Sequence, residues 1–130
     1  MIVVTADNEM AMLVLGTNLA KLLRGSEAVF ISGSLGAGKT TLCRGMLRAM
    51  GHIGAVKSPT FTLVEPYEIE GVEVSHFDLY RLSDPGELDY IGIEEYFAKK
   101  GLCLVEWPEK ALGRLPQHDL EITIDVCGEK

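Results

Sequence analysis

Residues 33–40, which read GSLGAGKT, have the spacing of a loop that binds phosphate groups. They match the pattern G-x-x-x-x-G-K-[ST], in which glycines let backbone N–H groups point at phosphate oxygens and the following helix adds partial positive charge. In this pattern Lys39 would reach the β and γ phosphates, and the hydroxyl of Thr40 would be a ligand of Mg²⁺. The loop therefore predicts a site for a nucleotide with Mg²⁺; the alternative is a glycine-rich turn without a ligand. The expected nucleotide-binding residues of this stretch are Ser34, Gly36, Ala37, Gly38, Lys39, Thr40 and Thr41.

Two acidic residues come directly after short apolar runs. Asp78 follows residues 74–77 (VSHF), and Glu106 follows residues 102–105 (LCLV). Ligands of open α/β sheets bind at the carboxyl ends of strands, so both carboxylates are expected beside the phosphate-binding loop. Such acids hold Mg²⁺ and position water in phosphoryl transfer. The alternative for each is a surface acid near a turn.

The loop has to be positioned by a strand before it and a helix after it. Residues 28–32 are a short apolar run that predicts the strand, and residues 40–50 have helical composition with Gly51 as a stop. An earlier helix is expected to begin at Asp7 as its N-cap and to end before Gly25. The apolar positions at helical spacing in that helix are Met12, Leu15, Leu19, Leu22 and Leu23.

The remaining pattern predicts further strands and two short helices. Residues 61–67 and 72–77 indicate an antiparallel hairpin that turns at Glu70 and Gly71. One short helix is expected to be capped by Asp84, Pro85 and Glu87, and another is expected over residues 93–100, ending at Gly101. A buried strand is expected over residues 102–105, and a half-exposed strand over residues 120–126. The mixture predicts an α/β fold whose sheet has an antiparallel part.

Composition and charge limit the function classes. A chain of 130 residues fits one domain, so we expect residues 1–130 to form a single unit. With 19 acidic and 12 basic residues, the net charge of −7 argues against unaided binding to nucleic acid or to an anionic membrane. The three cysteines, Cys43, Cys103 and Cys127, are far apart and are expected as buried small hydrophobes in a reducing compartment. Neither a leader nor a membrane span is indicated, so we expect a cytoplasmic protein.

Three further segments resemble motifs of one family. They are SPTFTLV at residues 58–64, HFDLYRL at residues 76–82 and LVEWPE at residues 104–109. In this order around the phosphate-binding loop they resemble the TsaE family, small bacterial ATPases needed to form threonylcarbamoyladenosine on tRNA. The resemblance implies a P-loop NTPase-like three-layer sandwich with a mixed sheet and an antiparallel hairpin. It also implies action in complex with the two proteins that carry out the transfer, with tRNA contacted only indirectly and no membrane.

The resemblance also implies roles for single residues. Asp78 and Glu106 would serve the metal and the attacking water, in roles that the sequence leaves unassigned between them. Thr60 lies in a switch-like loop that would sense the γ phosphate; the alternative is a hydroxyl at the start of a strand. Trp107, the only tryptophan, is expected beside the nucleotide, and its alternative is a ring in the core.

Two further residues of these motifs have plainer interpretations. His76 is interpreted as a histidine with satisfied hydrogen bonds at a strand end rather than as a catalytic group. Arg81 is expected to pair with Asp84 or Glu87, and the alternative is an arginine finger that acts in a complex.

Other functions share the phosphate-binding loop. The alternative to an ATPase is a small-molecule kinase, which would need cations for its acceptor and a closing lid. A regulatory GTPase is disfavoured because the only asparagines, Asn8 and Asn18, precede Glu and Leu and cannot form Asn-Lys-x-Asp. A binding module without catalysis would not need the paired acids.

The sequence departs from the family's pattern at its end. The family's chains continue past the last strand with a Gly-Arg pair and another strand, whereas this sequence stops at Lys130. Contacts to the base, or an edge strand, are therefore expected to differ or to be absent.

Overall fold

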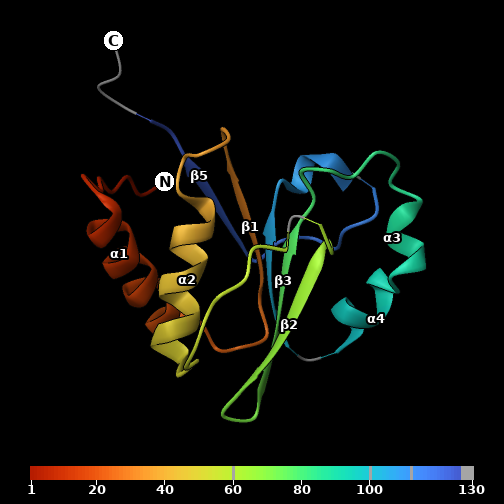
Figure 1. Cartoon of the computed structure of the whole chain (residues 1–130), viewed down its shortest axis with the longest axis horizontal. Coiled ribbons are helices and arrows are strands. Elements are labelled where there is room, and N and C mark those ends of the chain that lie inside the picture. Colours follow the sequence, from red (N-terminus) through yellow and green to blue (C-terminus); the bar gives the residue numbers. More distant parts are fainter. Residues whose placement is uncertain (60, 100, 112, 127–130) are drawn as a thin grey trace.

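The computed structural model describes residues 1–59, 61–99, 101–111 and 113–126. Within these residues a five-stranded sheet lies between two helical layers (Figure 1). The strands are β1 (Ala28–Gly33), β2 (Val64–Ile69), β3 (Val72–Asp78), β4 (Leu102–Glu106) and β5 (Leu120–Ile124). The helices are α1 (Glu9–Leu22), α2 (Lys39–Met50), α3 (Glu87–Tyr90), α4 (Ile93–Ala98) and the 3₁₀ turn η1 (Pro108–Ala111).

The sheet is mixed, in the order β2-β3-β4-β1-β5. Strands β3, β4, β1 and β5 run parallel, and β2 pairs antiparallel with β3. The hairpin turns at Glu70 and Gly71, which both adopt positive φ (49° and 84°), as a tight two-residue hairpin turn requires. The predicted fold class, the hairpin and its turn are therefore confirmed.

Helices on opposite faces of the sheet enclose two cores. Figure 1 shows α1 and α2 on one side and α3 and α4 on the other. Alternate residues of β4 point to opposite faces, so Leu102 and Leu104 pack toward α2, while Cys103 and Val105 pack toward α3 and α4. The carboxyl ends of β1, β3 and β4 meet at one edge, uppermost in Figure 1, and this edge positions the candidate site.

Helices α1 and α2 approach so closely that their backbones touch. A Cβ added to Gly16 of α1 would overlap the carbonyl oxygen of Leu42, and one added to Gly45 of α2 would overlap that of Leu13. Only glycine fits at either position of this crossing. The contact fixes α2, and with it the residues that follow the phosphate-binding loop.

We expect Gly16→Ala to lower the free energy of unfolding by about 1–3 kcal/mol, because the added methyl group forces the helices apart. Helix propensity alone would change stability in the opposite direction, since alanine in a helix is favoured over glycine by about 0.5–1 kcal/mol. Chemical denaturation measures whether the substitution lowers or raises the free energy of unfolding. Asn18→Ala, at an exposed position of the same helix, is the control. A stabilised Gly16→Ala variant would contradict the close crossing.

Several predicted boundaries are wrong by one to three residues. The N-cap of α1 is Asn8, whose side chain accepts a hydrogen bond from the N–H of Ala11 (2.8 Å), and not Asp7. Strand β2 begins at Val64 rather than at residue 61, because Leu63 takes a φ of 70° and turns the chain before it joins the sheet. Leu22 is 79% exposed, since α1 ends there and Leu23 packs on the core in its place.

The two short helices and the last strand are also shorter than predicted. The Asp84 carboxylate accepts the N–H of Gly86 (2.9 Å) and so caps a turn, after which α3 begins at Glu87. Helix α4 ends at Ala98, and β5 ends at Ile124. Lys100 and Cys127 lie outside the described residues, whereas the other two cysteines are buried as predicted. Within the described part of the chain, none of the helices has the length and apolar character needed to cross a membrane.

Candidate functional site

The predicted phosphate-binding loop connects the end of β1 to the start of α2. Gly36 and Gly38 adopt φ values of 80° and 108°, a conformation that other residues rarely take. Gly38 is the N-cap of α2, so the loop ends at the positive end of that helix. Ser34 and Gly36 are exposed, Ala37 and Gly38 are half-buried, and Thr41 is half-buried on the first turn of α2. The loop is thus open to solvent and has the backbone that an anion requires.

Lys39 folds back over this loop. Its side chain is nearly buried, and Nζ donates hydrogen bonds to the carbonyl oxygens of Gly33 (2.8 Å) and Ser34 (2.7 Å). The same Nζ lies 4.4 Å from the centre of the Trp107 ring. Burial lowers the pKa of the Lys39 ammonium, and the negative charges of Glu106 and Asp78 oppose that shift. The Lys39 ammonium therefore interacts electrostatically with the carboxylates of both Glu106 and Asp78.

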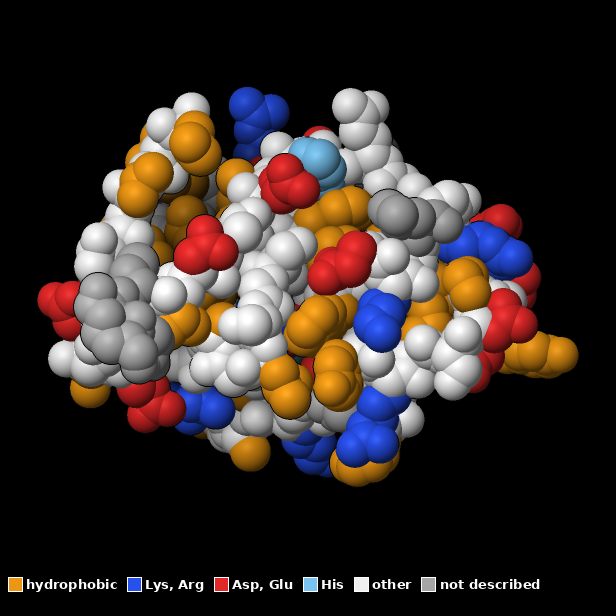
Figure 2. Space-filling model, turned by 90° about the horizontal axis from the view of Figure 1, so that it is seen from above, with side chains coloured by type: hydrophobic (Ala, Val, Ile, Leu, Met, Phe, Trp, Pro, Cys, Tyr) orange, Lys and Arg blue, Asp and Glu red, His pale blue; other side chains and the backbone are white. Residues whose placement is uncertain are grey.

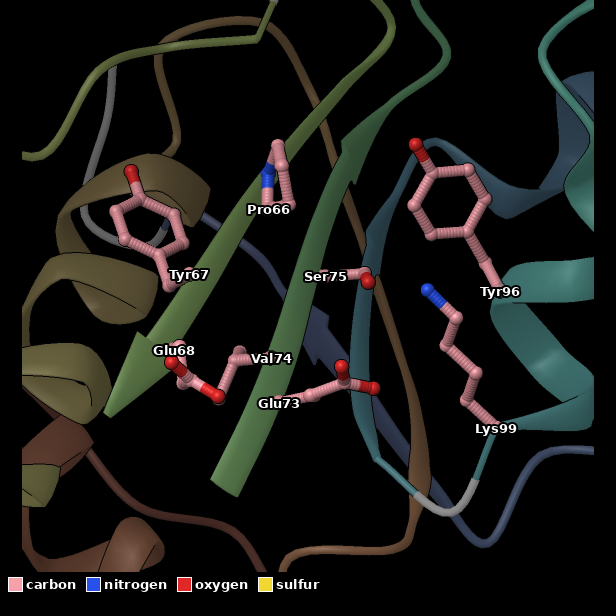
Figure 3. A pocket seen from close by; sticks show the side chains of 8 residues that line it. All are labelled: Pro66, Tyr67, Glu68, Glu73, Val74, Ser75, Tyr96 and Lys99. Carbon is pink, nitrogen blue, oxygen red and sulfur yellow. The ribbon is translucent and has the colours of Figure 1, made fainter. Parts of the chain in front are cut away.

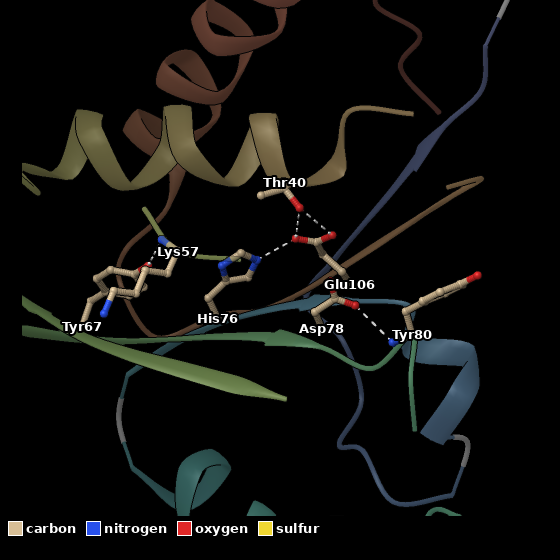
Figure 4. A network of polar contacts seen from close by, with 7 residues as sticks. All are labelled: Thr40, Lys57, Tyr67, His76, Asp78, Tyr80 and Glu106. Atoms are coloured by element: carbon tan, nitrogen blue, oxygen red, sulfur yellow. Dashed lines mark hydrogen bonds and ion pairs between the residues drawn. The ribbon is translucent and has the colours of Figure 1, made fainter. Parts of the chain in front are cut away.

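Glu106 is the centre of a buried polar cluster (Figure 4). The hydroxyl of Thr40 lies 3.2 and 3.1 Å from the two carboxylate oxygens, and Nε2 of His76 lies 2.6 Å from Oε2. Glu106 and His76 are 2% and 0% exposed. The cluster joins the first turn of α2 to the ends of β3 and β4, so the structure brings these predicted residues together.

Asp78 ends β3 and stands opposite Glu106 in the pairing of β3 with β4. Its Oδ1 accepts a hydrogen bond from the N–H of Tyr80 (3.1 Å), and the residue is 6% exposed. The interpretation of Asp78 and Glu106 as plain surface acids is therefore wrong for both, since both are buried at one edge of the sheet.

Trp107 holds its ring beside the loop through an unusual backbone conformation. Its φ is 60°, a region that costs energy for residues other than glycine and that occurs often at functional sites. Its N–H donates to the carbonyl of Ile31 (3.2 Å), and its ring lies 5.0 Å from that of Tyr80. The ring therefore lies over the Lys39 ammonium, just after the end of β4.

The structure adds two residues to the predicted site and places one elsewhere. Cys43 lies on α2 one turn after Thr40. Its Sγ lies within 4.8 Å of a ring nitrogen of His76 and of a carboxylate oxygen of Glu106. Burial and the charge of Glu106 raise the pKa of the Cys43 thiol well above its ordinary value, so it stays protonated at neutral pH. Tyr80 was also missed, although it lies in the HFDLYRL motif. Arg81 stacks 4.6 Å over the Phe61 ring.

The two acids expected to pair with Arg81 bind backbone instead. The Asp84 carboxylate accepts the N–H of Gly86, and the Glu87 carboxylate accepts the N–H of Ser83 (3.2 Å). Within the described residues the predicted Arg81 ion pair is therefore wrong. Thr60, predicted to sense the γ phosphate, lies outside the described residues.

A hollow in the surface lies away from the predicted site residues. It has a volume of about 310 Å³ and opens between the β2–β3 hairpin and α4, where Tyr96 and Lys99 reach toward β3 (Figure 3). None of the predicted site residues lines it. By contrast, the end of the molecule seen in Figure 2 carries apolar and acidic side chains side by side near its centre. The motif residues therefore mark the edge at the carboxyl ends of the strands as the candidate site.

A glycine-rich loop between a central parallel strand and a helix, with carboxylates at the ends of the neighbouring strands, defines a P-loop NTPase-like α/β protein. A family model described as threonylcarbamoyl adenosine biosynthesis protein TsaE matches residues 6–130. The chain therefore belongs to the TsaE family.

Curated relatives and a solved structure agree with this membership. The tRNA threonylcarbamoyladenosine biosynthesis protein TsaE of Haemophilus influenzae is 50% identical over 123 residues, which are 91% of this chain and 78% of the relative. The protein of the same name from Bacillus subtilis is 37% identical over 110 residues, 85% of this chain and 68% of the relative. The crystal structure of Bacillus subtilis YdiB superposes with a TM-score of 0.78 at 30% identity, covering 95% of this chain and 75% of that one.

Proposed function

We propose that this protein is a Mg²⁺-dependent ATPase required for threonylcarbamoylation of adenosine in tRNA, and that it acts in complex with the two proteins that carry out the transfer. The names of its relatives support the pathway. The observation that carries the ATPase is the contact of Thr40 with Glu106, because it joins the phosphate-binding loop to a buried carboxylate at a strand end.

The residues present fit a magnesium ion. Mg²⁺ prefers oxygen ligands and uses one or two carboxylates together with phosphate oxygens and water. The hydroxyl of Thr40 and the carboxylates of Asp78 and Glu106 offer such oxygens at one edge of the sheet. Bound Mg²⁺ would neutralise charge on the β and γ phosphate oxygens of ATP.

The chain's own residues supply binding and orientation. The backbone of residues 34–38 and the start of α2 would bind the phosphates, and the Lys39 ammonium would leave its carbonyl partners to contact the β and γ oxygens. Asp78 and Glu106 would hold the metal and orient the water that attacks the γ phosphorus. Trp107 would screen this region from bulk water, since its ring already covers Lys39.

We expect the protein to hydrolyse ATP slowly by itself and faster with its two partner proteins, because a site completed by a partner gains groups that it lacks alone. Linkage then requires the partners to bind one nucleotide state preferentially. The test combines the chain with the two transfer proteins and compares the ATP-bound, ADP-bound and empty states for complex formation, hydrolysis and repeated tRNA modification.

The matched control in that experiment is the Lys39→Ala chain, which keeps the surface but removes the phosphate-binding cation. Absence of a complex in every state, or repeated modification that continues without this chain, would refute the proposal. A small-molecule kinase would then be the better interpretation of the loop, because it uses the same phosphate site.

A further inference from the structure

His76 is buried where the fold does not require a polar residue. It lies on β3 beside Leu104 of β4, on the face that packs against α2, and its neighbour two positions earlier on that face is Val74. The side chain is 0% exposed. An apolar residue at this position would extend the core without the cost of burying an imidazole.

The imidazole satisfies only one of its two nitrogens within the described residues. Nε2 lies 2.6 Å from Oε2 of Glu106, whereas Nδ1 is buried without a hydrogen-bond partner. Because an ionised carboxylate only accepts hydrogen bonds, Nε2 is the donor. A buried group left half-satisfied is unfavourable for folding, so the contact with Glu106 is what the histidine contributes.

That contact restricts how the Glu106 carboxylate can turn. One oxygen is fixed by His76, and the Thr40 hydroxyl lies at similar distances from both oxygens. The carboxylate therefore faces the first turn of α2 before any ligand arrives. We propose that His76 is a positioning residue, which holds Glu106 in the orientation that Mg²⁺ and nucleotide require. The inference rests on the proposed ATPase function and adds a residue to its site.

Cys103 is the natural control because its thiol is buried on β4 but packs on the opposite face of the sheet, toward α3 and α4. Removal of the Cys103 thiol is expected to disturb packing without releasing Glu106. His76→Leu removes the donor and retains an apolar side chain. His76→Gln places an amide nitrogen about where Nε2 lies, whereas the amide of His76→Asn is one carbon too short to reach Glu106.

The experiment measures ADP affinity by calorimetry with and without Mg²⁺, together with ATP turnover and the thermal unfolding midpoint. In His76→Leu the gain in ADP affinity caused by Mg²⁺ should fall about 10- to 100-fold, the usual effect of removing a partner of a metal ligand. ADP affinity without Mg²⁺ should stay unchanged. His76→Gln should recover most of the loss and His76→Asn should not, while Cys103→Ala should lower only the unfolding midpoint. If His76→Leu does not fold, the Gln and Asn variants carry the same comparison.

Two results would overturn the role of His76. One is Mg²⁺-dependent ADP affinity equal to that of the parent in His76→Leu, or in His76→Asn if the leucine variant does not fold. The other is an equal loss in the Gln and Asn variants, which would show that the imidazole only fills space. Failure of the proposed function is a separate result, because the unmodified protein itself would then bind ADP no more tightly with Mg²⁺ than without it.

Discussion

Lys39→Ala is expected to weaken ATP binding by about 100-fold or more while the fold stays intact. A charged hydrogen bond to phosphate contributes about 1.5–3 kcal/mol, and Lys39 would make more than one. The substitution leaves the glycines and the start of α2 in place, so the loss reports the cation. Calorimetric titration with ATP and Mg²⁺ measures it, and adenosine, which lacks phosphates, should bind the variant and the parent alike.

The fluorescence of Trp107 provides a second readout of the role of Lys39, measured in the parent protein. The Trp107 ring lies 4.4 Å from Nζ of Lys39, so nucleotide that draws the ammonium away should change the indole fluorescence. The control substitution is Lys110→Ala, which removes an exposed ammonium 5.8 Å from the Tyr80 ring and should leave ATP affinity nearly unchanged. ATP binding by Lys39→Ala as tight as that of the parent would exclude the phosphate-binding role of the loop.

The parts of the site that sequence could predict are those set by local pattern. The loop is identified by glycine spacing, and a strand end by the apolar run before it, so Lys39, Asp78 and Glu106 could be predicted without any knowledge of long-range pairing. The hairpin turn at Glu70 and Gly71 is likewise a local property, because two positive φ values are needed at adjacent positions.

The parts that could not be predicted depend on which strands become neighbours. Asp78 and Glu106 are paired only because β3 lies beside β4 in one particular register. His76 meets Glu106 through the same register, and a shift by one residue would turn its side chain to the other face of the sheet. The sequence interpretation of His76 as a satisfied histidine missed the unpartnered Nδ1 for this reason.

The closeness of α1 and α2 was missed for a related reason. Gly16 and Gly45 lie inside regular helices, where a glycine has no local role and lowers helix propensity. Only the crossing of the two helices explains them, and nothing in either helix by itself indicates the partner. Sequence reasoning therefore predicted both helices but not what holds them together.

Glu106→Gln should reduce ATP turnover by about 100-fold or more and should lower ATP affinity in the presence of Mg²⁺ by a smaller factor, about 10-fold. The amide keeps the size of the side chain and an oxygen that can accept from Thr40 or His76, so the substitution removes chiefly the negative charge. That charge matters most in the transition state, where the metal and the attacking water must be held in place. Asp78→Asn tests the neighbouring carboxylate in the same way, and steady-state hydrolysis with calorimetry separates turnover from binding.

The control for these two variants is Glu109→Gln, which neutralises an exposed acid on η1 and should retain turnover near that of the parent. Comparing the two buried positions also divides their roles. A variant that loses the Mg²⁺ dependence of ADP binding has lost a metal ligand, whereas one that keeps it and loses turnover has lost the group that orients water. Turnover at the level of the parent in both variants would mean that the buried carboxylates do not serve hydrolysis.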